Sequence, residues 1–164
     1  ISPYQYPKAE NYKESNLKTV FMGPVMRDWS LLNNSLFACL NGIEVRDEMP
    51  QDIGDIYGVT ALDQDVTIIN QVIKYLKYGF GRMTDYANEE IRLGNISRNY
   101  GINLVEKYDG RCSKNYFIRF AKYLGISYEE FWGIVGKYVN NDLFEKVDFD
   151  KYIPKFTVGK GLKN

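Results

Sequence analysis

Residues 113–138 read SKNYFIRFAKYLGISYEEFWGIVGKY, and this stretch decides the fold. On either side of Gly125, a typical helix stop, apolar residues recur at helical spacing. Each run follows a serine, which favours the N-terminal cap of a helix, and Ser127 and Glu130 have the spacing of a capping box. The expected apolar faces are Phe117, Phe120, Ala121 and Leu124 in the first helix and Phe131, Ile134, Val135 and Tyr138 in the second. The stretch therefore predicts two amphipathic helices joined by a tight turn.

The same start and stop signals continue upstream, and no proline interrupts the chain between Pro50 and Pro154. The spacing of apolar residues predicts further helices, each ended by a glycine, over 62–78, 84–93 and 97–109. With the two helices above, they predict a compact domain of about five short helices over residues 61–150.

The N-terminal part of the chain predicts one short β-α unit. A β-prone run at 17–22 predicts a strand, and helical spacing over 28–40 predicts the helix behind it. Residues 43–60 show little periodicity and are rich in Asp and Glu, so we expect an acidic loop there. The predicted fold class is therefore mainly α: a short N-terminal β-α unit followed by the helical domain.

The ends of the chain carry no clear periodicity. Residues 1–16 are interpreted as an arm or linker, and residues 17–60 as the β-α unit with its acidic loop. Residues 151–164 place four lysines among proline and glycine and are interpreted as a C-terminal tail. Because the numbering begins at Ile1, we expect an N-terminus cut through a longer protein.

The composition excludes several classes of function. Lys and Arg together number 21, as do Asp and Glu, so the chain lacks the positive excess of a general nucleic-acid binder. It contains no histidine, which removes Ser-His and Cys-His nucleophile pairs and His-ligated metals. No apolar run reaches the roughly 18 residues of a membrane span, and no signal-peptide pattern is present. We therefore expect a cytoplasmic domain without a membrane span.

The two cysteines suggest neither a metal site nor a disulfide. Cys39 lies in an apolar stretch and is interpreted as a buried small side chain, whereas Cys112 follows a turn and is expected to be more exposed. Neither has the spacing of a zinc site. No metal ligands and no catalytic residues are assigned.

The run Gly79-Phe80-Gly81-Arg82 is the strongest candidate for chemistry. Two glycines before an arginine can indicate a phosphate-binding loop, but the run follows a predicted helix and lacks the third glycine of a dinucleotide fingerprint, so Gly79 as a helix stop is the plainer interpretation. Asp85, Glu89 and Arg92 then share one helix face and form either a solvated ion-pair face or an anion site.

An alternative function is a protein- or DNA-interaction module. Residues 117–138 fit a helix-turn-helix, whose second helix would meet DNA through its N-terminal residues. Those residues include Glu129 and Glu130, which have the wrong sign for phosphates. We therefore do not expect nucleic-acid binding.

The segment from Lys77-Tyr78 through Gly79-Phe80-Gly81-Arg82 to Asp109-Gly110 resembles the C-terminal region of a known enzyme family. These are the N-acetyl sugar amidotransferases of lipopolysaccharide O-antigen and nonulosonic acid synthesis, the WbpG-like proteins of the PP-loop ATPase family. The resemblance is dense over 74–110 and looser to Trp132.

The resemblance implies a bacterial, cytoplasmic, ATP-dependent reaction that converts the acetamido group of a nucleotide-linked sugar to an acetamidino group. Glutaminase and synthase-like subunits would supply the ammonia. The Ser-Gly-Gly-Lys-Asp-Ser type motif that binds ATP in the family does not occur in this sequence. The chain is therefore expected to be a C-terminal fragment that binds no cofactor and is not catalytic alone. Self-association through its many aromatic residues is left open.

The resemblance also implies a substrate-binding role for four residues of this region. Arg82 and Arg92 are the candidate contacts to an anionic group of the sugar nucleotide, and Asp85 would orient one of them. Lys77 is a weaker candidate at the border of the preceding helix.

Overall fold

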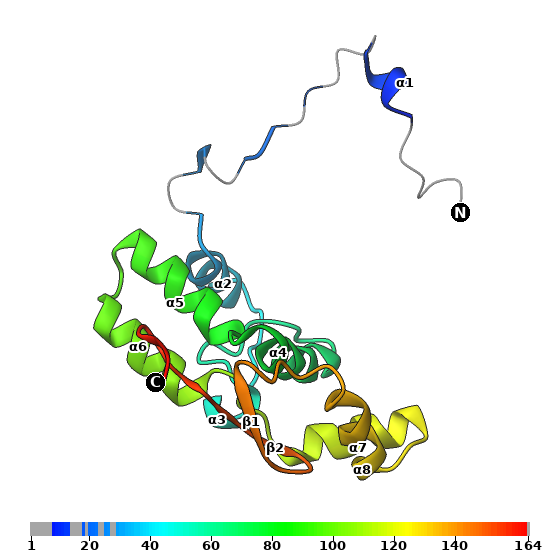
Figure 1. The fold of residues 1–164 in the computed structure, drawn as a ribbon. Helices are drawn as coiled ribbons and strands as arrows, with labels where there is room; N and C mark the ends of the chain where they lie inside the picture. Colours follow the sequence, from blue (N-terminus) through cyan, green and yellow to red (C-terminus); the bar gives the residue numbers. More distant parts are fainter. Residues whose placement is uncertain (1–7, 14–17, 19, 23–24, 27–28, 164) are drawn as a thin grey trace.

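The computed structural model describes residues 8–13, 18, 20–22, 25–26 and 29–163. In this part of the chain, helices come first and short antiparallel hairpins follow at the C-terminal end (Figure 1). The helices are α1 (Ala9–Lys13), α2 (Leu31–Leu40), α3 (Pro50–Ile53), α4 (Val66–Tyr78), α5 (Arg82–Leu93), α6 (Arg98–Tyr108), α7 (Lys114–Leu124) and α8 (Tyr128–Val135). The strands are β1 (Phe144–Asp148), β2 (Lys151–Pro154), β3 (Phe156–Thr157) and β4 (Gly161–Leu162). The prediction of a mainly α fold is confirmed.

The boundaries of α4 to α8 follow local signals in the sequence. Gly79, Gly94 and Gly125 end α4, α5 and α7 with φ values of 80°, 78° and 73°, a left-handed conformation that glycine adopts without a Cβ clash. The Oγ atoms of Ser97 and Ser127 each accept a backbone N–H three residues further on, at 3.2 and 3.0 Å. The five predicted helices are therefore confirmed.

Among α4 to α8, two helix starts differ from the prediction, and α2 begins at Leu31 where residue 28 was predicted. α4 begins at Val66, four residues after the predicted start, because residues 62–63 form a turn after Ala61, whose φ is 54°. α5 begins at Arg82, two residues before the predicted start. The reason is that the side chain of Asp109 accepts the first N–H groups of the helix, so the turn before Thr84 is already helical.

The larger core lies among α4, α7, α8 and the start of β1. It is dominated by aromatic rings, with the Phe117 and Trp132 centroids 5.0 Å apart. Its buried members are Ile53, Ile68, Ile69, Val72, Leu76, Tyr116, Phe117, Ala121, Phe131, Trp132, Val135, Val139 and Phe144. Burial of these side chains is the main force holding this half of the domain together.

A smaller core lies between α5 and α6. Its buried members are Met83, Tyr86, Ala87 and Val105, and Leu31 of α2 packs against them from outside. Gly101 of α6 allows the close approach of the two helices, because a Cβ atom there would lie 2.8 Å from Cδ1 of Ile91.

The predicted apolar face of α8 is wrong in part. Ile134 and Tyr138 are exposed, while Trp132 and Val139 are buried. The helix ends at Val135, so its periodicity does not govern Tyr138 and Val139, whereas within the helix it is Trp132 and not Ile134 that faces the core.

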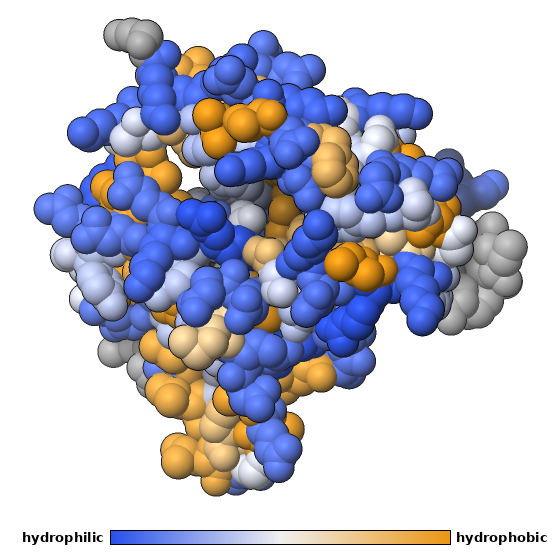
Figure 2. Space-filling view, turned by 90° about the horizontal axis from the view of Figure 1, so that it is seen from below, coloured by the Kyte–Doolittle hydropathy of each residue, from blue (hydrophilic) through white to orange (hydrophobic). Residues whose placement is uncertain are grey.

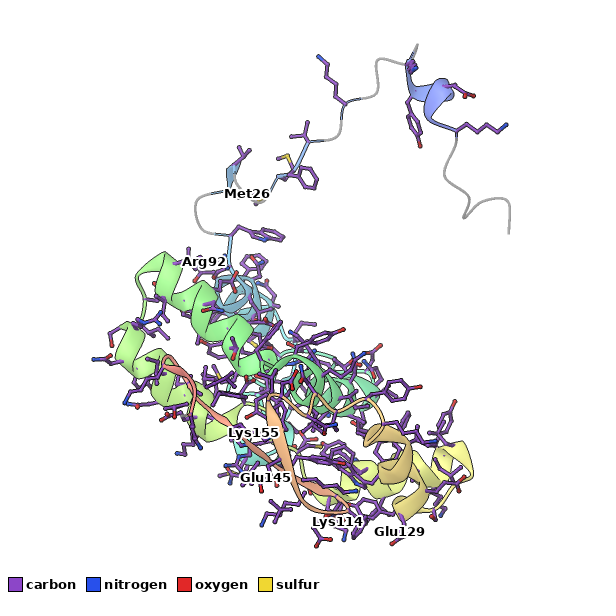
Figure 3. All side chains as sticks on the ribbon, viewed as in Figure 1. Met26, Arg92, Lys114, Glu129, Glu145 and Lys155 are labelled. Carbon is purple, nitrogen blue, oxygen red and sulfur yellow. The ribbon has the colours of Figure 1, made fainter. Side chains whose placement is uncertain are left out.

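The C-terminal residues form strands rather than a tail. β1 pairs with β2, with Phe144 opposite Pro154, and β3 pairs with β4, with Phe156 opposite Leu162. Phe156 packs against the larger core. Figure 3 shows Glu145 and Lys155 along this C-terminal region. The folded domain therefore continues past residue 150, because apolar side chains of the strands cover its core.

The N-terminal part departs furthest from the prediction. Residues 18 and 20–22 form no strand, and residues 17 and 19 of the predicted strand lie outside the described residues. The described strands pair with one another at the C-terminal end, which leaves no partner for a strand here. The predicted arm contains α1, which Figure 1 shows apart from the other helices.

The predicted acidic loop contains α3. Pro50 stands at the start of this short helix, where its missing N–H costs nothing, and Ile53 is buried in the larger core. Within α2, by contrast, no residue is buried. Cys39 and Cys112 are both free and partly buried, so the expected contrast between them is absent.

The face of the molecule in Figure 2 is hydrophilic over most of its area, with hydrophobic side chains gathered in separate patches. None of the helices in the described part of the chain has the length and apolar character needed to cross a bilayer.

Candidate functional site

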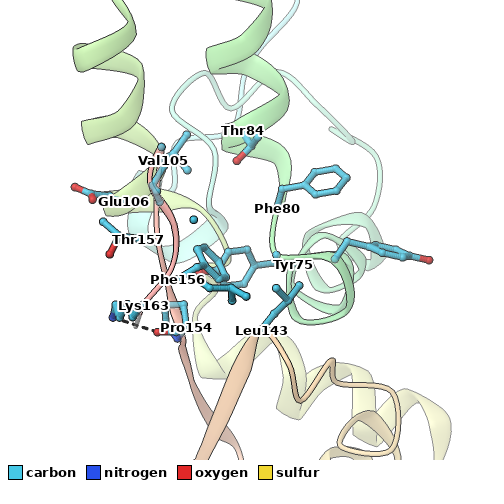
Figure 4. Close-up of a pocket in the computed structure, with 16 residues that line it drawn as sticks. Tyr75, Phe80, Thr84, Val105, Glu106, Leu143, Pro154, Phe156, Thr157 and Lys163 are labelled. Carbon is cyan, nitrogen blue, oxygen red and sulfur yellow. Dashed lines mark hydrogen bonds between the residues drawn. The ribbon is translucent and has the colours of Figure 1, made fainter.

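A pocket of about 520 Å³ opens where α4 ends and α5 begins. Figure 4 shows Phe80 and Thr84 on one side of it and Val105 and Glu106 of α6 on the other, with Tyr75 and Phe156 between them. The hairpin of β3 and β4 contributes the remaining wall, from Thr157 to Lys163. This volume lies within the range of ordinary small-molecule pockets, about 300–1,000 Å³.

The turn from Gly79 to Thr84 is held in place by Asp109. Asp109 Oδ2 accepts the N–H of Gly81 at 2.8 Å and the Thr84 hydroxyl at 2.7 Å, and Oδ1 accepts the N–H of Met83 at 3.0 Å. A Cβ atom at Gly81 would lie 2.7 Å from the Asp109 carboxylate, so only glycine leaves room for this contact. Burial raises the pKa of Asp109, and the donors offset part of that shift.

The hairpin wall is joined to the rest of the domain by backbone hydrogen bonds. The Lys155 N–H donates to Leu143 O at 2.8 Å, and the Lys163 N–H donates to Lys155 O at 2.7 Å. The Lys163 ammonium donates to Pro154 O at 3.3 Å, as the dashed line in Figure 4 marks. Lys163 is therefore held at the pocket with its charge accessible to solvent.

The polar groups that line the pocket differ in whether they are free to bind a ligand. The Thr84 hydroxyl is used by Asp109, and the Tyr75 hydroxyl has a pKa raised by burial to about 12, so it remains protonated at neutral pH. Glu106 and Lys163 are exposed. The pocket thus combines an apolar interior with one carboxylate and one ammonium group at its edge.

None of the four residues predicted to bind substrate lines this pocket. Arg82 is buried, and its Nη1 lies 3.7 Å from Asp55 Oδ2. Arg92 is exposed at the far end of α5, where its Nε donates to Asn88 O at 3.2 Å. These two arginines therefore do not converge on one anion in this structure.

The remaining two predicted residues also have local partners. Asp85 accepts from the Lys74 ammonium at 2.6 Å, so it does not orient either arginine. Lys77 lies with its Nζ 5.3 Å from the centroid of the Tyr78 ring. In this structure, therefore, Asp85 pairs with Lys74 of the neighbouring helix and not with an arginine.

Arg82 belongs to a buried polar cluster that fixes the loop after α3. Asp55 Oδ1 accepts the N–H groups of Tyr57 and Gly58 at 2.8 and 3.1 Å, and Oδ2 accepts the Tyr86 hydroxyl at 3.2 Å. Arg82 supplies the positive charge that this buried carboxylate needs. In this structure Arg82 therefore connects the loop after α3 to α5 through its ion pair with Asp55.

Sequence reasoning missed most of the pocket. Phe80 stood in the quoted run but was not assigned a role, Lys163 was assigned only to the C-terminal tail, and Glu106 was given no binding role. The one local signal was the presence of two aromatic residues, Tyr78 and Phe80, on either side of the helix stop Gly79. Their ring centroids lie 6.2 Å apart.

The start of α5 does not fit the triphosphate of ATP. A triphosphate needs free backbone N–H groups or cations, as at a helix N-terminus. At the start of α5 those N–H groups are taken by Asp109, and Arg82 is taken by Asp55. Among the described residues, no group of three or more Cys, Asp or Glu side chains is placed to hold a metal ion.

The helix-turn-helix alternative gains no support from the surface of α8. The predicted pair exists as α7 and α8, but Glu129 and Glu130 are exposed in the first turn of α8. DNA phosphates would meet negative charge at this position.

The fold and the pocket define a small helical domain closed by C-terminal hairpins. The chain belongs to the family of C-terminal domains of WbpG-like lipopolysaccharide biosynthesis proteins, whose family model matches residues 47–157, more than half of the chain. Membership supports a role in lipopolysaccharide biosynthesis. No curated protein and no solved structure matches the chain significantly.

Proposed function

We propose that this chain is the substrate-handling C-terminal domain of an ATP-dependent amidotransferase of lipopolysaccharide O-antigen synthesis. The full enzyme would exchange the oxygen of an acetamido group on a nucleotide-linked sugar for nitrogen, leaving an acetamidino group. Ammonia would come from glutaminase and synthase-like partners in the cytoplasm. The observation that carries the proposal is the family match over residues 47–157.

We propose a binding role, without catalysis, for this domain within that enzyme. The pocket of about 520 Å³ has an apolar interior, with Glu106 and Lys163 at its edge, and such a lining suits binding. ATP is proposed to bind to a part of the full protein that carries the PP-loop. This domain would then hold the sugar nucleotide while the reaction takes place next to it.

Arg92 and Lys77 remain candidate contacts to the anionic part of the substrate. Arg92 is exposed, so its guanidinium is available to a phosphate. Arg82 is a weaker candidate than the sequence indicated, since its loss would leave Asp55 buried without a cation.

The proposal is tested with the full-length enzyme, ATP, ammonium and a nucleotide-linked N-acetyl sugar. We expect AMP release coupled to the product mass that results from replacing one oxygen by an NH group. Arg92→Ala should raise the KM for the sugar nucleotide, with Arg98→Ala, an exposed arginine at the start of α6, as the matched control. Absence of nitrogen transfer with each nucleotide-linked N-acetyl hexosamine tested would contradict the proposal.

A further inference from the structure

We propose that the 520 Å³ pocket binds the pyranose ring of the nucleotide-linked sugar, rather than its nucleoside. This inference rests on the proposed function for the substrate class, and on the pocket itself for the part of the substrate that is held. It assigns sugar-binding roles to Phe80, Glu106 and Lys163.

Two aromatic rings at the pocket wall are exposed. Tyr78 is 57% exposed and Phe80 is 41% exposed, and each ring lies beside a lysine. The Lys74 ammonium lies 4.6 Å from the centroid of Phe80 and is itself held by Asp85. These contacts hold the rings in place, so they offer a prepared apolar surface to the C–H groups of a sugar ring.

The polar groups at the pocket edge are better suited to bind the hydroxyl groups of a sugar than to bind the nucleobase of the substrate. The Glu106 carboxylate accepts only, and its two oxygens can take two neighbouring sugar hydroxyls. Thr157 lies beside it in Figure 4 and can both donate and accept. A pyranose ring presents such hydroxyls around an apolar face, which matches this combination of an aromatic wall and a carboxylate edge.

The charges of Glu106 and Lys163 also determine how the substrate is oriented in the pocket. Glu106 repels phosphate, whereas Lys163 is held at the edge formed by Pro154 and the β3–β4 hairpin. A diphosphate attached to the bound ring is therefore expected to leave the pocket past Lys163. The nucleoside would then lie outside this domain.

The test measures binding to the 164-residue chain by saturation-transfer NMR and calorimetry. The probes are UDP-N-acetylglucosamine, free N-acetylglucosamine and UDP. We expect saturation to reach the sugar protons more strongly than the uracil protons, and UDP alone to bind at least about tenfold more weakly than the UDP-sugar. Phe80→Leu should weaken binding of the UDP-sugar about three- to tenfold.

Matched variants outside the pocket distinguish the loss of a sugar contact from a general effect of the substitution on the protein. Phe149 is 39% exposed, nearly as much as Phe80, but lies in the β1–β2 turn outside the pocket, so Phe149→Leu should bind as the wild type does. Glu106→Gln should weaken sugar binding, whereas Glu129→Gln, placed by Figure 3 on α8, should not.

Three results would overturn the inference: UDP binding as tightly as the UDP-sugar, unchanged affinity in Phe80→Leu, or no binding of any probe. The proposed function fails separately, because it is measured as turnover by the full-length enzyme. Turnover with unchanged KM in Phe80→Leu would overturn the inference alone. Sugar binding to this chain without turnover would overturn the proposed function alone.

Discussion

The carboxylate of Asp109 closes the N-terminus of α5 from the end of α6, accepting the Gly81 N–H at 2.8 Å. The two residues are 28 positions apart in the chain. Through this contact the residue that ends α6 determines where α5, the preceding helix, begins, because the first N–H groups of α5 have no partner within their own helix.

Asp109→Asn should destabilise the domain. An amide offers one acceptor oxygen where the carboxylate offers two, and its NH₂ group would face the buried donors of Gly81, Met83 or Thr84. We expect the free energy of unfolding to fall by about 2–3 kcal/mol in urea denaturation. Asp142→Asn, an exposed aspartate, should change it by less than about 0.5 kcal/mol. Equal effects of the two substitutions would contradict the capping role.

The stability difference between wild type and Asp109→Asn should depend on pH. Burial raises the pKa of Asp109 above its usual 3.8, so the folded state binds this proton more tightly than the unfolded state does. Its contribution to stability is then fully present below the unfolded pKa and is lost as pH rises through the folded pKa. The advantage of wild type should be larger near pH 4 than near pH 7. A stability advantage of wild type that grows with pH would show that folding lowers the pKa of Asp109 and does not raise it.

Tyr116→Phe should reveal a pH dependence of the other sign. The Tyr116 hydroxyl donates to Glu48 Oε1 at 2.6 Å and holds the pKa of Glu48 below its usual 4.5. That contribution is present above the unfolded pKa and is lost as pH falls through the folded one. Because Glu48 is one-third exposed, we expect a loss of only about 1 kcal/mol at pH 7, shrinking below about pH 4. Tyr138→Phe, at an exposed tyrosine, is the control for the urea titrations.

Gly110→Ala should be more harmful than Gly125→Ala, although both glycines have left-handed φ values, of 69° and 73°. At Gly125 a Cβ atom would meet open space, so only the backbone cost of about 1–2 kcal/mol applies. At Gly110 it would overlap the ring of Tyr75, adding about 1–3 kcal/mol. The comparison is made by thermal unfolding. Similar melting temperatures for the two variants would contradict the overlap with Tyr75.

Cys112 should react slowly with thiol reagents in the native state. Burial raises the pKa of its thiol to about 12, so almost no thiolate is present at pH 8. In Cys39→Ser, labelling by a chromogenic disulfide should be slow and should accelerate with urea as the domain unfolds. Labelling of the native protein at the rate of a free thiol would contradict the burial of Cys112. The Cys112→Ser variant, in which only Cys39 can react, gives the labelling rate of Cys39 for comparison.

The features of the fold that could be predicted from the sequence are those helix ends that are determined by residues close to them in the chain. Gly79 and Gly125 stop helices because of their own backbone freedom, and Ser97 and Ser127 cap helices through atoms three residues away. Such signals act within one turn of the chain, so they can be recognised without knowledge of the tertiary structure.

The candidate site depended on contacts between distant residues. Asp85 shares a helix face with Arg92, yet it pairs with Lys74, because α4 and α5 meet at the Gly79–Gly81 turn. Arg82 has the spacing of an anion contact, yet Asp55 neutralises it from a loop 27 residues earlier. Helical spacing places residues on a face but does not say which neighbouring element covers that face.

By itself, the sequence determined the helical class, the glycine-stopped and serine-capped helices from α4 to α8, and the run at Gly79–Arg82 that indicated the family. Only the tertiary structure decided that the C-terminal lysine-rich residues form the hairpin wall of a pocket, and that Asp109 rather than a ligand occupies the start of α5. The reason is physical: helix signals are short-range, whereas strand pairing and buried charge are satisfied by whichever partners folding brings together.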